Sequence, residues 1–140
     1  MTLASDPHLD LDFALNAGLR AYIRAVSVAI GSGWEACSLD FGSPLGAYIA
    51  LDWRLAAHPG CDLALLWHER QGWSAVLETP SGEDLTVARL GGPVVAEPRV
   101  VVKFLAEVRA GRTPSPSPVL AGSVAELTAE LTPYLERPVL

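Results

Sequence analysis

The chain has 140 residues, of which 50% are apolar, and 16 acidic against 10 basic side chains give it a formal net charge of −6. This length corresponds to one domain, and the apolar fraction predicts a buried core that needs neither disulfide nor metal for stability. The negative charge weighs against nucleic-acid binding, which depends on contacts between cations and phosphates. Cys37 and Cys61 are too few for a disulfide framework and are expected to be buried thiols.

The amino-terminal residues and the hydropathy pattern predict a cytoplasmic protein with no membrane partner. The first twelve residues, MTLASDPHLDLD, lack the basic start and the apolar core of a signal peptide. No run reaches the roughly 18–20 apolar residues that a bilayer-spanning helix needs. The most apolar helical window, Leu15–Ile30, is interrupted by Arg20 and Arg24. These two arginines could seat a phosphate, but they are more typical of the solvated flank of a helix.

The first half of the chain predicts one helix followed by strands. The helix begins near Asp10 or Asp12 and ends at the glycines of Gly31–Gly33, since apolar residues recur every three or four positions between them. Beyond it, alternation of apolar and polar residues predicts strands that are separated by Gly- and Pro-containing turns. The predicted strands are Trp34–Leu39, Leu45–Trp53, Leu63–Trp67, Trp73–Leu77 and Leu85–Leu90.

The stretch Asp62–Thr79 predicts a β-hairpin, because two apolar runs flank a short polar turn. A three-residue loop that ends in Gly suits the span Arg70–Gly72, and this loop would place Trp67 opposite Ala75. Opposed residues in neighbouring strands share a face of the sheet. The hairpin therefore predicts a core face that carries Leu65, Trp67, Trp73 and Leu77.

The last third of the chain predicts two more helices. One begins at Pro98, a residue favoured at the first helical position, and ends at Gly111. The segment Pro114–Pro118 is expected to be an extended linker. Ser123 and Glu126 then form a capping box that begins a short terminal helix.

Together these elements predict an α+β fold. It consists of an N-terminal helix, a four- to five-stranded antiparallel meander and two C-terminal helices, with the helices on one face of the sheet and the other face partly wet. The expected organisation is a tail over residues 1–9, an α+β domain over 10–111, a Pro/Ser linker over 112–122, and a C-terminal helix and tail over 123–140.

The segments Tyr48–Leu55, Asp62–Ser74 and Val100–Gly111 resemble a family of small actinobacterial proteins of unknown function. The resemblance covers roughly residues 15–112 and carries no recognised catalytic motif, so it implies a bacterial cytoplasmic domain and no particular activity. A looser fold analogy is to secretion-chaperone-like α+β domains, in which the remaining surface holds a partner protein. The sequence departs from that fold, because no segment between the strands is long enough for its middle helix.

The sequence gives no sign of a metal or cofactor site. The three histidines His8, His58 and His68 lack metal-ligand spacing, and the phosphate-binding loops and the nucleophile-elbow motif are absent. The best constellation of polar residues is predicted on the sheet face opposite the core. The candidate binding residues are Tyr48, Asp52, Arg54, His68, Glu69, Arg70, Ser74 and Glu78, and the candidate catalytic residues among them are Asp52, His68 and Tyr48.

This polar face has three interpretations. It is an ordinary solvated sheet face, a surface that binds a protein partner or a small ligand, or an acid–base site. The preferred prediction is a non-catalytic binding or regulatory module, and the alternative is a small, possibly biosynthetic enzyme. A third class is an adaptor that clamps a peptide through Pro114–Pro118. Self-association as a homodimer is expected, because an antiparallel meander leaves two edges that a twofold dimer could pair.

Overall fold

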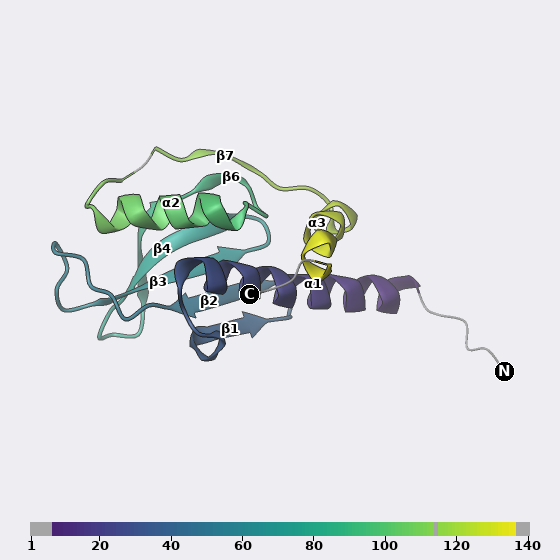
Figure 1. Cartoon of the computed structure of the whole chain (residues 1–140), viewed down its shortest axis with the longest axis horizontal. Coiled ribbons are helices and arrows are strands. Elements are labelled where there is room, and N and C mark those ends of the chain that lie inside the picture. Colours follow the sequence, from purple (N-terminus) through teal and green to yellow (C-terminus); the bar gives the residue numbers. More distant parts are fainter. Residues whose placement is uncertain (1–6, 114, 137–140) are drawn as a thin grey trace.

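The computed structural model describes residues 7–113 and 115–136, with the side chains of residues 7–11 excepted. It confirms the α+β fold: an N-terminal helix, a five-stranded antiparallel sheet and C-terminal helices (Figure 1). The helices are α1 (Pro7–Ile30), α2 (Pro98–Arg109) and α3 (Val124–Leu131), with short 3-10 turns η1 (Trp34–Ala36) and η2 (Thr132–Leu135). The strands are β1 (Cys37–Asp40), β2 (Gly46–Ala50), β3 (Asp62–His68), β4 (Gly72–Glu78), β5 (Asp84–Arg89), β6 (Gly91–Pro93) and β7 (Ser117–Leu120).

The main sheet is a simple meander in the order β1-β2-β3-β4-β5. Its helices α1 and α2 lie on one side of it (Figure 1). The third helix, α3, and the turn η2 pack on α1 instead of directly on the sheet. Gly18 permits this contact, because a Cβ at that position would lie only 2.9 Å from the Cβ of Leu131.

The predicted core face of the hairpin is confirmed. Trp67 and Trp73 are 0% and 1% exposed and point toward the helices, together with the aliphatic side chains of β2, β3 and β4. This orientation follows from period-two alternation, because the apolar residues at every second position of a strand share one face and the residues between these positions point to the other. Aromatic side chains of this size supply much of the buried apolar area of a small domain.

The register of the hairpin differs from the prediction. Trp67 lies opposite Trp73 and not opposite Ala75, so the pairing is displaced by two residues although each side chain keeps its face. The backbone N–H of Gln71 donates to the backbone carbonyl of His68 at 3.1 Å, and Gly72 follows with φ +72°. Gly72 thus belongs to β4 and uses its left-handed conformation to enter the strand, so that the loop begins one residue earlier than predicted.

Three other boundaries also differ. Helix α1 begins at Pro7, so part of the predicted tail is helical, while residues 1–6 lie outside the described residues. Trp34–Ala36 forms a 3-10 turn instead of a strand. The predicted Pro/Ser linker contributes β7, which pairs in parallel with β6. Its extended backbone can form this ladder because proline, which lacks a backbone N–H, is tolerated at positions that donate no hydrogen bond.

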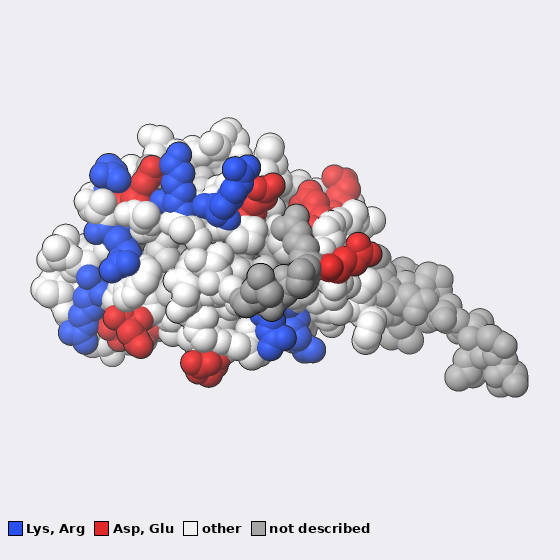
Figure 2. Space-filling view, in the orientation of Figure 1, with Lys and Arg blue, Asp and Glu red and all other residues white. Residues whose placement is uncertain are grey.

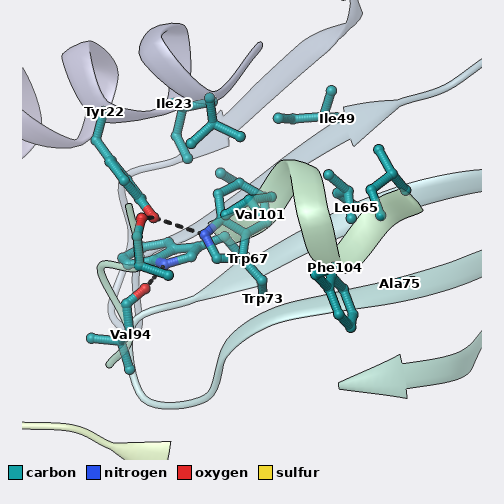
Figure 3. Close-up of a cluster of buried hydrophobic side chains, with 14 of the residues drawn as sticks. Tyr22, Ile23, Ile49, Leu65, Trp67, Trp73, Ala75, Val94, Val101 and Phe104 are labelled. Carbon is teal, nitrogen blue, oxygen red and sulfur yellow. Dashed lines mark hydrogen bonds between the residues drawn. The ribbon is translucent and has the colours of Figure 1, made fainter. Parts of the chain in front are cut away.

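The hydroxyl of Tyr22 joins the layers of the core (Figure 3). It donates to the carbonyl of Ala96, in the segment before α2, and accepts the indole N–H of Trp73 on β4 at 2.9 Å. The indole N–H of Trp67 donates to the carbonyl of Val94 at 2.7 Å. Every buried polar side-chain atom of the described residues has a partner, so these buried indoles and the phenol incur no unmet desolvation cost.

By length and composition, the segment Asp12–Ile30 of α1 could cross a membrane. In this fold its stripe of Leu15, Leu19, Tyr22 and Val26 is buried in the core. Packing of this kind is typical of a core helix, which satisfies the same criteria of length and composition.

Replacing Tyr22 with Phe should lower the free energy of unfolding by about 1–3 kcal/mol, because the Trp73 N–H and the Ala96 carbonyl lose their buried partner. Urea unfolding followed by tryptophan fluorescence measures this loss. Tyr48→Phe, which removes the same atom from a partly exposed ring, should cost less than about 1 kcal/mol. Equal stability of Tyr22→Phe and the unaltered protein would contradict the assigned role of this hydroxyl.

Candidate functional site

The side of the sheet away from α1 and α2 is the candidate site, and we call it the open face. None of the described helices lies on it (Figure 1). The pairing register and the burial pattern define its members, which alternate with the core residues along β1 to β4 and follow the shifted register of β5. They are Ser38, Asp40, Tyr48, Ala50, Asp62, Ala64, Leu66, His68, Ser74, Val76, Glu78, Asp84, Thr86 and Arg89.

The centre of the open face is tightly packed although no other layer of the described residues covers it. Ala64 and Val76 are 0% exposed there, and Ser74 is 5% exposed. The hydroxyl of Tyr48 on β2 donates to a carboxylate oxygen of Glu78 on β4 at 2.5 Å, so its side chain crosses β3 above these small residues. A bulky side chain at position 64 would obstruct this crossing, which explains why small residues occupy the middle of the face.

Two hollows flank the Tyr48 side chain, and both have Tyr48 and Ser38 in their walls. One, of about 520 Å³, reaches the β1–β2 turn and His68. The other, of about 460 Å³, reaches Glu78 and Asp84. The open face is therefore a ridge between two depressions and is not flat.

The charges on the open face differ between its two ends. At one end Asp62, Glu78 and Asp84 are direct cross-strand neighbours on β3, β4 and β5. Carboxylates placed opposite one another repel. The negative charge of Asp62 is offset by an ion pair with Arg54 at 3.1 Å. Partial burial raises the pKa of the Tyr48 hydroxyl, and the hydrogen bond to Glu78 and its negative charge raise that pKa further.

The other end of the face holds the remaining polar residues of the hairpin. His68 pairs with Gly46 and Gly72, and its Nδ1 accepts the backbone N–H of Arg70 at 3.0 Å. Arg89 donates to the side chain of Gln71 at 3.3 Å. This end is therefore basic on its β4–β5 side.

The structure brings some of the predicted site residues together and separates others. Tyr48, Ser74 and Glu78 share the open face, but Ser74 is buried. Glu69 has a local role, because its carboxylate accepts the backbone N–H of Leu45 at 2.6 Å. Arg70 is exposed in the turn.

Asp52 and His68 do not meet. Asp52 lies beside the start of β3, because the backbone bonds of Leu51 and Trp53 both join Leu63. His68 is at the end of the same strand, which at about 3.3 Å per residue is roughly 20 Å from its start. Asp52 therefore does not reach His68, and the predicted catalytic trio of Asp52, His68 and Tyr48 is not assembled in this structure. Arg54, two residues after Asp52, does not reach His68 either.

Arg54 instead holds the loop between β2 and β3. Its guanidinium donates to Asp62 at 3.1 Å and to the carbonyl of Pro59 at 3.0 Å. Within the described residues, no group of three or more His, Cys, Asp and Glu side chains is arranged to hold a metal ion.

Sequence reasoning missed Asp84 and Arg89 as members of the open face. The signal was weak, because a register shift between Ala75 and Val76 inserts Val87 into the β4–β5 ladder and breaks the period-two pattern of β5. A cation-bearing cleft at the end of α2, described below, was missed as well.

A family model described as a family of unknown function, DUF6292, matches residues 22–107. The chain belongs to this family. The DUF6292 region begins at Tyr22 in the middle of α1, contains all five strands of the main sheet and ends within α2. The open face and the Tyr22 hydroxyl therefore lie inside it, whereas β7 and α3 lie outside it. A comparison with curated proteins and with solved structures gave no match.

Replacing Glu78 with Gln should lower the pKa of Tyr48 toward its ordinary value of about 10 while burial keeps it above that value. NMR titration of ¹³Cζ-labelled tyrosine measures this pKa directly. Asp52→Asn, which removes an exposed carboxylate elsewhere, should leave it unchanged.

The raised pKa also has a consequence for stability. It favours the neutral hydroxyl in the folded state, so its stabilisation is fully present below pH ~10 and is lost as the pH rises through the pKa of folded Tyr48. An ordinary pKa for Tyr48 in both the unaltered protein and Glu78→Gln would rule out the Tyr48–Glu78 contact in solution.

Proposed function

We propose that this protein is a non-catalytic binding module whose open face is a protein-contact surface. The observation that carries the proposal is a sheet face with a close-packed centre and no described helix on it, where Tyr48 and Leu66 are partly exposed. Tyrosine is enriched in protein interfaces, since its ring adds contact area at low entropic cost and its hydroxyl remains hydrogen-bonded.

The partner that this face fits best is a second copy of the chain. Asp62, Glu78 and Asp84 lie at one end of the face, and His68 and Arg89 lie toward the other. Asp40 lies at the His68 end as well, on β1, so only the β4–β5 side of that end is basic. A twofold axis parallel to the face and perpendicular to the strands would place Asp84 of one copy on Arg89 of the other, because both residues lie on β5. Such complementarity favours one register of association and penalises others.

The alternative of a small enzyme that uses Asp52, His68 and Tyr48 receives less support. General acid–base catalysis needs the participating groups within hydrogen-bond reach of one substrate. Asp52 and His68 lie near opposite ends of β3, and the Tyr48 hydroxyl is bonded to Glu78 at the end away from His68.

The setting of this module is also a proposal. The resemblance noted from the sequence favours an actinobacterial cytoplasm, and the analogy to secretion-chaperone-like domains favours a protein as the partner. A dimer that uses the open face would have the role of a scaffold or regulator, with no reaction of its own.

Light scattering coupled to size-exclusion chromatography should give the mass of a dimer that dissociates on dilution. Arg89→Glu should weaken the dimer by about tenfold or more, because like charges would then face one another. Adding Asp84→Arg to that variant should restore the dimer, since positions 84 and 89, which face one another across the twofold axis, have then exchanged charge.

Lys103→Glu makes the same reversal on the exposed side of α2 and should have no effect on dimer mass. A monomer at all concentrations would refute the second copy as partner. Equal weakening by Arg89→Glu and Lys103→Glu, or no rescue by Asp84→Arg, would show that the open face is not the surface involved.

A further inference from the structure

A cleft of about 410 Å³ lies where α2 ends, on the helix side of the sheet and away from the open face. Its walls come from the β2–β3 loop, from β5 and from the last turn of α2 with the residues that follow it. Pockets of roughly 300–1,000 Å³ are of the size that holds a small organic ligand.

The cleft combines an apolar floor with a cationic rim. Leu55, Val87 and Val108 form the floor. His58, Arg109 and Arg112 belong to the rim, and all three side chains are exposed. Figure 2 shows Lys and Arg side chains gathered over α2 and along this end of the molecule, although the whole chain has a net charge of −6.

The guanidinium of Arg109 is held in place by stacking. Its Cζ lies 3.6 Å from the centroid of the Trp53 ring. A guanidinium that stacks over an aromatic ring keeps its N–H groups in its own plane and directed outward, where they can bind a carboxylate or phosphate in a bidentate manner. Neither Arg109 nor Arg112 forms an ion pair with a carboxylate within the described residues, whereas Arg54 and Arg99 do.

The end of α2 is the negative end of the helix dipole, so an anion there depends on the arginine side chains for its stabilisation. The carbonyls of residues 106–108 already accept N–H groups, from Ala110, Gly111 and Arg112, each at 3.0 Å, which lessens the repulsion of a negative charge. The β2–β3 loop is fixed by the bonds of Arg54 to Asp62 and Pro59, which holds His58 at the rim.

We infer that this cleft binds a small organic phosphate monoester, with the phosphate on Arg109 and Arg112 and the organic group on the apolar floor. Two guanidinium groups match the charge of a phosphate dianion better than that of a singly charged carboxylate. The apolar floor favours an organic phosphate over inorganic phosphate. This site is independent of the proposed dimer, because none of its wall residues belongs to the open face.

Phenyl phosphate is a suitable probe, because it joins a dianion to a flat apolar group. In a ¹H–¹⁵N NMR titration of the full chain, it should cause saturable shifts in the amides of residues 55–58 and 108–113. Phenol, benzoate and inorganic phosphate each lack one part of the proposed ligand, so each should bind at least about tenfold more weakly.

The double variant Arg109→Gln/Arg112→Gln should lose these shifts. Arg99→Gln/Lys103→Gln removes the same amount of charge from within α2, away from the cleft, and should retain them. Spectral dispersion reports whether each variant is folded. If the double variant does not fold, Arg112→Gln alone provides the test. It keeps the stack of Arg109 on Trp53 and should weaken binding of phenyl phosphate by about tenfold.

Absence of saturable shifts with phenyl phosphate would overturn the inference. So would equal losses in the two double variants, which would indicate nonspecific attraction of anions to α2. Binding of inorganic phosphate as tight as that of phenyl phosphate would exclude the apolar floor as part of the site.

Discussion

The Tyr22 hydroxyl is the contact on which the arrangement of layers depends. It bonds at once to β4 through Trp73 and to the segment before α2 through Ala96, while the Tyr22 ring packs edge-on against Tyr134 with centroids 4.8 Å apart. One residue of α1 thus contacts the sheet and the segments that lead to α2 and follow α3. Because these contacts use the core side of the sheet, the described helices all gather there, and the open face has no such cover.

The sequence was sufficient to predict the two faces of the sheet. Period two in β2, β3 and β4 places Trp67 and Trp73 inside in both the predicted and the observed register, because a displacement by two residues preserves the face of every side chain. For the same reason Tyr48 and Glu78 could be assigned to one surface. The capping box at Ser123 was also a local signal, and its hydroxyl accepts the Glu126 N–H as expected.

What the sequence did not reveal depends on contacts between distant segments. The distance between Asp52 and His68 follows from the pairing of β2 with β3, which the loop between these strands sets and the hydrophobic pattern does not. The pairing of β7 with β6 joins residues far apart in the chain. The cleft at the end of α2 likewise exists only because the loop that contains Arg54 folds toward Arg109, and no local motif encodes that approach.

Hydroxyl-radical footprinting at two protein concentrations tests the central claim most directly, namely that the helix side is closed and the open face associates. Trp67 and Trp73 should resist oxidation at both concentrations, whereas Tyr48 and Leu66 should be oxidised in dilute protein and protected in concentrated protein. Phe13, which is 77% exposed on α1, should react equally at both concentrations. Oxidation of Trp67 and Trp73 as fast as that of Tyr48, or a Tyr48 rate independent of concentration, would contradict the account.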